Sequence, residues 1–118
     1  MIEEGVLPRL FAEGSYNTRL DIISELPKGS VLWSFAETDM ARAKQILGDR
    51  ACIEGNVPAS LLAYSTPKDV DAYCKKLIET CNEGGGYILC PSTASQENAK
   101  PENLKAMIKA AKTYGVYR

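Results

Sequence analysis

The sequence predicts an α/β fold built from four consecutive strand–helix units, and three features support this. Four short apolar runs alternate along the chain with segments whose apolar residues recur at helical spacing. Glycine and proline residues separate these segments. The chain's 118 residues suit a single domain, residues 1–118. Because a helix follows each strand, we expect right-handed crossovers and a parallel sheet.

The expected strands are residues 6–12, 31–36, 51–54 and 87–90. The first contains Pro8, which lacks a backbone N–H and therefore makes this the weakest of the four strands. Trp33 and Phe35 alternate along the second strand, a spacing that predicts core positions.

The expected helices follow these strands. The first begins near residue 17 or 18 and ends at Pro27, and the second begins after a cap at Thr38 or Asp39. A third helix starts at Thr66, with Pro67 in its first position, and glycines 84–86 end it. Pro101 opens a fourth helix. The residues expected to face inward are Leu20, Ile23 and Leu26; Met40, Ala43, Ile46 and Leu47; Val70, Tyr73, Cys74, Leu77, Ile78 and Cys81; and Leu104, Met107, Ile108 and Ala111.

A four-stranded parallel sheet leaves two architectures open: a small open sheet, or half of an eight-stranded β/α barrel. Such a barrel takes ~250 residues, or roughly 30 per strand–helix unit. Four units in 118 residues match that length. A small doubly wound binding domain is a further alternative, although no typical glycine-rich loop follows the first strand.

Composition excludes several classes of function. Fourteen Lys and Arg residues against fifteen Asp and Glu give a net charge of −1, which argues against a nucleic-acid binder. The chain has no histidine, so catalytic schemes and metal sites that need one are excluded within it. Neither a membrane-length apolar run nor a signal peptide is evident. Four cysteines without a Cys-x-x-Cys pair are typical of reduced thiols in the cytoplasm.

Candidate site residues lie where strands end, because this is the working face of a β/α barrel. Glu13 and Glu37 follow the first and second strands, and two facing carboxylates can form an acid/base pair. We therefore predict Glu13 and Glu37 as catalytic residues. The alternative is that Glu13 is solvated and that Thr38 and Asp39 only cap a helix.

Polar residues after the third and fourth strands are candidates for substrate binding. Asn56 could offer its amide to a substrate carbonyl or carboxylate, or could instead accommodate a left-handed turn. Ser92 and Thr93 lie in a small polar loop at a place where barrels often bind anions. Cys90, at the end of the fourth strand, is a nucleophile only if its thiolate is stabilised, and burial is the simpler interpretation.

Several sequence blocks resemble the carboxyl-terminal half of the uroporphyrinogen decarboxylase family, and the likeness covers essentially the whole chain. The most specific block is Gly55-Asn56-Val57-Pro58 followed by the helix start Thr66-Pro67. The other matching blocks are Glu37-Thr38-Asp39-Met40, Ala43-Lys44, Leu47-Gly48, Cys52-Ile53-Glu54, Ser60-Leu61-Leu62, Gly85-Gly86-Tyr87-Ile88-Leu89, Lys100-Pro101-Glu102-Asn103, Ala106-Met107-Ile108 and Tyr114-Gly115.

The resemblance implies that this chain supplies the last four strand–helix units of a TIM (β/α)8 barrel whose amino-terminal half is absent. The implied reaction is decarboxylation of acetate side chains on a tetrapyrrole, without a cofactor. Methyl transfer to or from a corrinoid carrier is the alternative within the same family, and a non-catalytic half-barrel module is another. The family's zinc-binding positions correspond here to Phe11-Ala12-Glu13 and Thr93, which lack its histidine and cysteines, so we expect no metal.

The expected partners follow from an incomplete barrel. Four strands cannot close a barrel, and its open edges would expose unpaired backbone groups. We therefore expect either self-association or pairing with an amino-terminal half, in addition to a small-molecule substrate.

Overall fold

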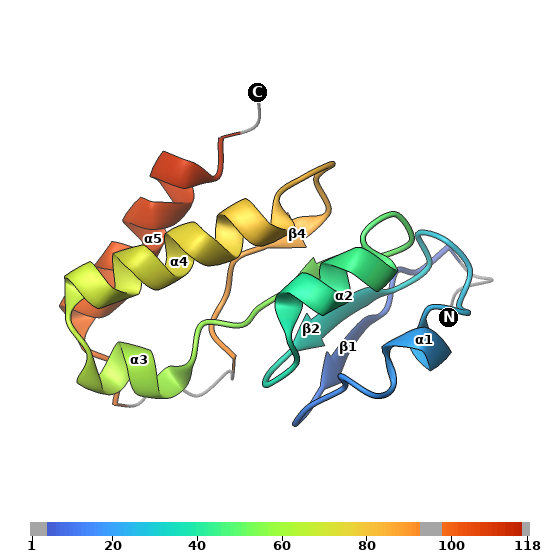
Figure 1. Cartoon of the computed structure of the whole chain (residues 1–118), viewed down its shortest axis with the longest axis horizontal. Helices are drawn as coiled ribbons and strands as arrows, with labels where there is room; N and C mark the ends of the chain where they lie inside the picture. The colour runs from blue at the N-terminus through green and yellow to red at the C-terminus, as the bar shows by residue number, and fades with distance from the viewer. Residues whose placement is uncertain (1–4, 93–97, 117–118) are drawn as a thin grey trace.

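A parallel four-stranded sheet organises the chain. In the computed structural model, which describes residues 5–92 and 98–116, the strands lie in the order β1-β2-β3-β4 and all pair in parallel (Figure 1). Their bounds are β1 Arg9–Ala12, β2 Leu32–Phe35, β3 Cys52–Glu54 and β4 Tyr87–Ile88. Consecutive order is that of a barrel wall, whereas a doubly wound sheet would reverse its order partway. The predicted fold class is therefore confirmed.

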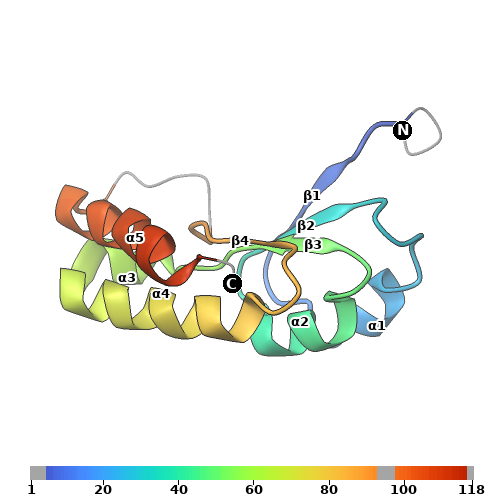
Figure 2. The ribbon, with the colours of Figure 1, turned by 90° about the horizontal axis from the view of Figure 1, so that it is seen from above.

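Helices cover one face of this sheet. Their bounds are α1 Leu20–Ile23, α2 Met40–Leu47, α3 Ala59–Tyr64, α4 Pro67–Cys81 and α5 Pro101–Tyr114. Figure 2 shows α1 and α2 beneath the strands, with α4 continuing on the same side. Helix α5 packs mainly against α4. None of the helices in residues 5–92 and 98–116 combines the length and apolarity needed to cross a membrane.

The predicted helix starts at residues 40 and 67 are confirmed by their caps. The Asp39 carboxylate accepts hydrogen bonds from the backbone N–H groups of Ala41 and Arg42, at 3.0 and 3.4 Å. The Thr66 hydroxyl accepts one from the Asp69 N–H at 3.2 Å. Each cap satisfies backbone donors that have no partner within the helix.

The hydrophobic core lies between the sheet and the helices. Ala12, Phe35 and Ile53, one from each of three neighbouring strands, are fully buried in it. Trp33 is also buried and stacks on Phe35 with ring centroids 6.3 Å apart, which confirms both as core residues. The helices contribute Leu20, Met40, Ala43, Leu47, Leu62, Val70, Cys74, Leu77, Cys81 and Ala110 to the same cluster.

The opposite face of the sheet is covered only in part by the described residues, because Ser34 and Glu54 in its middle are buried while its two outer strands are exposed. Phe11, Ser34, Glu54 and Ile88 stand in register across the four strands, and side chains at one register position point to one face. Phe11 is 51% exposed and Ile88 is 43% exposed. Arg9 reaches across this face to form an ion pair with the buried carboxylate of Glu54. We call the surface formed by Arg9, Phe11, Ser34, Glu54 and Ile88 the open face.

Several sequence predictions need correction. Helix α1 is a single turn that begins at Leu20, because no side chain caps it and Leu26 remains 37% exposed. Strand β4 ends at Ile88, short of the predicted residue 90. Helix α3 was not expected. Its six residues are too few to display a helical period, and the contacts of Leu62 and Ala63 with the rest of the fold bury them.

The inward faces of the two longest helices also differ from prediction. Ile108 of α5 is 52% exposed, whereas Asn103 and Ala110 are fully buried. Helix α5 packs on α4, and its Asn103 side chain is held by a hydrogen bond to the Leu62 carbonyl of α3. Tyr73 of α4 is 38% exposed because it borders a cavity rather than the core.

Candidate functional site

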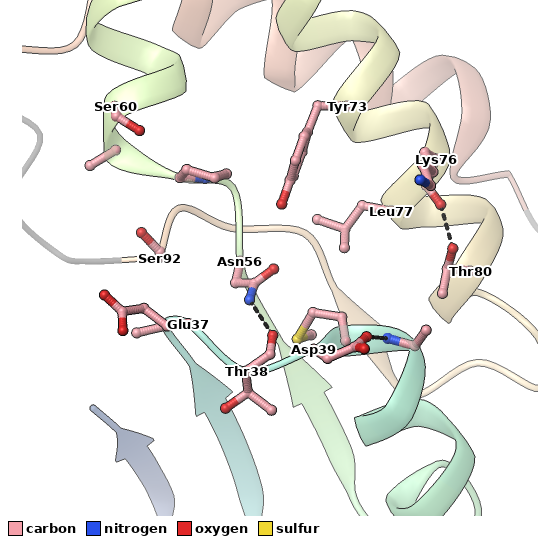
Figure 3. Close-up of a pocket in the computed structure, with 15 residues that line it drawn as sticks. Glu37, Thr38, Asp39, Asn56, Ser60, Tyr73, Lys76, Leu77, Thr80 and Ser92 are labelled. Atoms are coloured by element: carbon pink, nitrogen blue, oxygen red, sulfur yellow. Dashed lines mark hydrogen bonds between the residues drawn. The ribbon is translucent and has the colours of Figure 1, made fainter. Parts of the chain in front are cut away.

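A cavity of about 660 Å³ lies at the carboxyl ends of the strands, between the start of α2 and one side of α4 (Figure 3). Three of the predicted site residues, Glu37, Asn56 and Ser92, line it. The remaining lining residues are Ala36, Thr38, Asp39, Met40, Ala41, Pro58, Ala59, Ser60, Tyr73, Lys76, Leu77 and Thr80. The predicted location at the ends of the strands therefore contains a cavity.

The two predicted catalytic carboxylates sit on neighbouring loops, and the structure does not place them alike. The backbone N–H of Glu37 donates to the carbonyl of Gly14 at 3.0 Å, so the loops after β1 and β2 are joined beside both residues. Both side chains are exposed. Glu37 borders the cavity, whereas Glu13 is not among the residues that line it. Their pairing as acid and base stays a prediction.

Asn56 is the most constrained polar residue of the cavity. Its side chain donates from Nδ2 to the backbone carbonyl of Thr38 at 2.7 Å, and the residue is only 7% exposed. Its Oδ1 faces the cavity (Figure 3), and within the described part of the chain this oxygen has no hydrogen-bond donor. Asn56 thus fixes the loop after β2 and also presents an acceptor to a ligand.

The left-handed conformation expected at Asn56 belongs instead to Gly55. Gly55 has a φ of +124°, and a Cβ there would stand 2.5 Å from the carbonyl oxygen of Phe35. Only glycine fits such a position. The Tyr87 hydroxyl donates to the Gly55 carbonyl, and burial raises the pKa of Tyr87 so that it remains a donor. These contacts hold Asn56 at the cavity wall.

Thr38 joins three strand ends, a role that the sequence did not indicate. Its buried hydroxyl accepts from the backbone N–H of Tyr16 at 2.8 Å, and its carbonyl accepts from Asn56. The Asn17 side chain accepts from the N–H of Asp39 at 2.7 Å. The loops after β1, β2 and β3 are therefore tied together at the cavity rim. The interpretation of Asp39 as a helix cap is confirmed, whereas Thr38 does not cap that helix.

Ser92 reaches the cavity from the segment after β4. Its backbone N–H donates to the Val57 carbonyl at 2.8 Å, while the Val57 N–H donates to the Cys90 carbonyl at 3.0 Å. These bonds carry the parallel pairing of β3 and β4 beyond the strands. Thr93, also predicted to bind substrate, lies outside the described residues.

Cys90 is half-buried on the segment after β4. Burial, and next the charge of Glu54, raise the pKa of its thiol to about 11, against a smaller opposing effect of Arg9. The thiol is therefore protonated at neutral pH, which disfavours a nucleophilic role. Across residues 5–92 and 98–116, no group of three or more His, Cys, Asp or Glu residues could hold a metal ion.

Sequence reasoning missed the contribution of α4 to this site. Tyr73, Lys76 and Thr80 border the cavity from successive turns of that helix. The helical spacing of Tyr73 predicts a core position instead. Lys76 and Thr80 lie at the polar edge of the apolar face, and only the packing of α4 beside the start of α2 reveals their role.

Comparison with known proteins identifies the family. The model of the family "Uroporphyrinogen decarboxylase (URO-D)" matches residues 2–114. The uroporphyrinogen decarboxylase of Methylococcus capsulatus is 32% identical over 73 residues, which cover 62% of this chain and 21% of that protein. That of Chlorobium phaeovibrioides is 30% identical over 77 residues, covering 63% and 22%.

A more distant relative matches the same proportion of its own length. The uroporphyrinogen decarboxylase of Coxiella burnetii is 22% identical over 79 residues, covering 67% of this chain and 22% of that protein. The chain thus aligns with about a fifth of the length of these relatives. Because the family model covers nearly every residue, the chain belongs to the uroporphyrinogen decarboxylase family.

Proposed function

We propose that this chain forms the carboxyl-terminal half of a β/α-barrel enzyme that decarboxylates acetate side chains of a tetrapyrrole. The observation that carries the proposal is the cavity at the strand ends, which gathers Glu37, Asn56 and Ser92 in a chain of this family. The names of the relatives support the reaction, since each is a uroporphyrinogen decarboxylase.

The proposed reaction needs a proton donor more than a cofactor. A protonated pyrrole ring withdraws the electron pair of the bond to the carboxylate, so CO₂ leaves and the remaining methylene takes up a proton. In sum, an acetate side chain and one proton become a methyl group and CO₂. The protein's part is to orient the substrate, exclude water and move protons. The proposed mechanism uses neither a metal nor a corrinoid.

The cavity residues suggest a division of these tasks. Glu37 is a carboxylate at the rim and is the residue that we assign to proton transfer, with Glu13 on the adjoining loop as its partner. Asn56 presents an acceptor that suits the N–H of a pyrrole. Ser92 offers a hydroxyl for a substrate carboxylate, and Thr93 is assigned the same task on sequence grounds alone.

The rest of the barrel is proposed to come from a further four strand–helix units. The open face supports this, because it presents the apolar side chains of Phe11 and Ile88 beside the ion pair of the exposed Arg9 with the buried Glu54. Relatives about five times as long as the matched segment have enough residues for the missing units. A second copy of this chain is the alternative partner, and the experiment below includes it.

The test is a fusion of the first four strand–helix units of the Methylococcus capsulatus relative to this whole chain. Incubated with uroporphyrinogen without oxygen, the fusion should form coproporphyrinogen, which is measured as the oxidised porphyrin by chromatography. Glu37→Gln should abolish most of the product. Glu79→Gln, an exposed carboxylate on the other side of α4, is the matched control and should leave it unchanged.

Two outcomes would contradict the proposal. Consumption of methylcobalamin by the folded fusion without formation of coproporphyrinogen would assign methyl transfer instead. A folded fusion with neither activity would indicate a non-catalytic module. If the chain without the fusion forms coproporphyrinogen and scatters light as a dimer, the second copy is the partner.

A further inference from the structure

Helix α4 lines the cavity with hydrogen-bond donors to which the proposed function assigns no role. Tyr73, Lys76 and Thr80 border the cavity, and Leu77 lies among them. In Figure 3 the Tyr73 hydroxyl points into the cavity. Desolvation by burial raises the pKa of Tyr73, so its hydroxyl remains protonated and able to donate at neutral pH.

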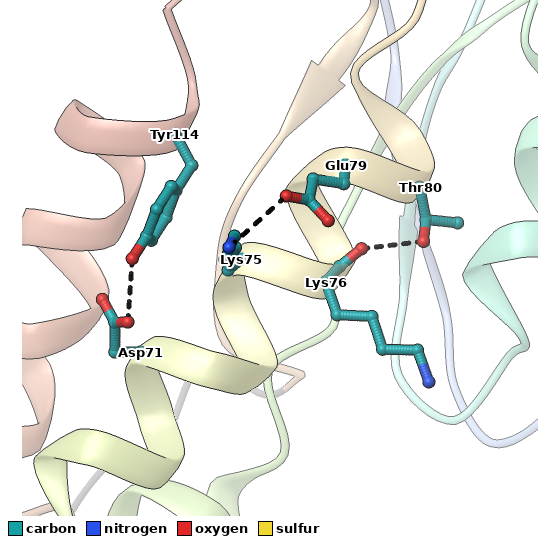
Figure 4. A network of polar contacts seen from close by, with 6 residues as sticks. All are labelled: Asp71, Lys75, Lys76, Glu79, Thr80 and Tyr114. Carbon is teal, nitrogen blue, oxygen red and sulfur yellow. Dashed lines mark hydrogen bonds and ion pairs between the residues drawn. The ribbon is translucent and has the colours of Figure 1, made fainter.

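Lys76 and its neighbour Lys75 have different surroundings. The Lys75 ammonium lies 4.0 Å from the Glu79 carboxylate and 5.6 Å from the centre of the Tyr114 ring, on the side of α4 that faces α5 (Figure 4). Lys76 borders the cavity, and within the described residues its ammonium forms no ion pair. The cavity therefore has a positive charge on its α4 side that no described carboxylate neutralises.

The opposite wall carries acceptors. Asn56 Oδ1 comes from a side chain that is nine-tenths buried, and it faces the cavity without a donor in the described part of the chain. Glu37 adds a carboxylate. The neighbouring Asp39 carboxylate is engaged by the backbone N–H groups of α2. Figure 3 shows Glu37 and Lys76 well apart, on opposite sides of the cavity.

We infer that the cavity binds an aromatic N–H carboxylate in one orientation, with its carboxylate at Tyr73 and Lys76 and its ring N–H at Asn56. The reverse orientation places the carboxylate against Glu37, and like charges repel. Leu77 and Pro58 offer the apolar surface that a ring needs between the two ends. The inference rests on the proposed function in that a pyrrole acetate is one such ligand, and it assigns Tyr73 and Lys76 to the substrate carboxylate.

Three small probes test the orientation with the whole chain. Indole-3-acetate carries both the N–H and the carboxylate, indole-3-acetamide lacks the charge, and 1-methylindole-3-acetate lacks the N–H. Titrations followed by the backbone and side-chain amide signals in NMR measure each affinity and show that the protein is folded. We expect indole-3-acetate to bind most tightly and to shift the Asn56 side-chain amide signal.

The variants separate the two lysines. Lys76→Gln should weaken indole-3-acetate binding about threefold to fivefold, as for an ion pair that is partly exposed to water. It should leave indole-3-acetamide binding unchanged. Lys75→Gln, on the same helix, should change neither affinity. Tyr73→Phe should weaken acid binding by a similar factor, since it removes one hydrogen bond. Tyr64→Phe, which alters an exposed hydroxyl outside the cavity, is its control.

Equal affinities for the acid and the amide would overturn the inference, and so would equal effects of the two lysine variants or the absence of binding to a folded chain. These titrations measure affinity and not catalysis, so a failure of the inference can be distinguished from a failure of the proposed function. If the fusion decarboxylates its substrate but Lys76→Gln leaves the affinity for indole-3-acetate unchanged, only the proposed orientation is wrong. If the folded fusion binds the acid selectively but does not decarboxylate its substrate, only the proposed reaction is wrong.

Discussion

The two faces of the sheet differ in what covers them. On the helix-facing side, Phe35 and Ile53 are fully buried in a cluster to which all five helices contribute. On the open face, Phe11 and Ile88 stay about half exposed, and the principal contact is the ion pair of Arg9 with Glu54. The comparison teaches that this chain completes one hydrophobic layer by itself, whereas the described residues leave the outer strands of the second layer about half exposed.

Removal of one aromatic ring from each face should separate the two layers most clearly. We expect Phe35→Ala to lower the free energy of unfolding by about 3 to 5 kcal/mol, because it leaves a cavity in a packed core. Phe11→Ala should change it by no more than about 0.5 kcal/mol in this chain. Urea denaturation followed by circular dichroism measures both.

The same pair of variants sharpens the comparison when the barrel is completed. In the fusion described above, Phe11 should lie inside a closed barrel, and its truncation should then cost roughly as much as that of Phe35. A Phe11→Ala cost that is already large in this chain by itself would mean that the open face is covered without a second half. A small cost in the fusion would mean that the added units leave Phe11 exposed.

Alkaline pH should weaken the helix-facing layer through its buried thiols. Burial raises the pKa of Cys74 and Cys81 to about 11, compared with about 9.0 for an exposed thiol in an unfolded chain. Both states are protonated below the lower value, so the effect on stability appears only above it. As pH rises further, the unfolded chain loses its protons first, and the folded state loses stability until the pH passes about 11.

The expected loss from the two thiols is about 2 kcal/mol by pH 9.5. Urea denaturation at a series of pH values between 8 and 10 should show this decline, and the double variant Cys74→Ala with Cys81→Ala should show a smaller one. Cys52→Ala removes a half-buried thiol on the third strand whose pKa is also raised by burial, and it should reduce the decline less than the double variant does. An unchanged slope in the double variant would show that other groups account for the alkaline loss.

A polar contact also stabilises the helical side of the molecule. The fully buried side chain of Asn103 donates from Nδ2 to the carbonyls of Leu62 and Ser65, each at 2.8 Å. Asn103→Ala should therefore lower the free energy of unfolding by about 1 to 2 kcal/mol, because the Ser65 carbonyl loses its donor while the Leu62 carbonyl keeps the Lys100 N–H. Asn82→Ala, at the half-buried residue that follows the last residue of α4, should cost less. Thermal unfolding of both variants tests this, and equal costs would contradict it.

Asn103 also shows what the sequence could and could not predict. Local signals sufficed for the strand–helix order and for the caps at Asp39 and Thr66, because spacing and side-chain chemistry determine these within a few residues. Helix α3 escaped because its stabilising contacts come from Asn103 and from the Lys100 N–H, about forty residues later in the chain. The pattern of apolar residues in a six-residue segment cannot predict contacts with residues so far along the chain.

The candidate site follows the same division. Glu37, Asn56 and Ser92 could be placed at one cavity because the ends of parallel strands meet at one edge. Tyr73 and Lys76 could not, since they reach the cavity only through the way α4 packs beside α2. The orientation of Asn56 likewise depends on Thr38, a residue from another strand end. The local sequence determines where a residue lies along a strand, whereas the opposite wall of the cavity depends on tertiary packing.

The smallest expected effect concerns the start of α4, the helix that supplies this wall. The Thr66 hydroxyl accepts from the Asp69 N–H, and Thr66→Ala should cost about 1 kcal/mol of unfolding free energy. Thr66→Ser keeps the acceptor and should restore most of that loss, and thermal unfolding measures both. A cap acts on the first turn, whereas Lys76 lies more than two turns further along. The Thr66→Ala variant should therefore keep its affinity for indole-3-acetate, so that a fall in affinity would mean that the wall moves with the end of its helix.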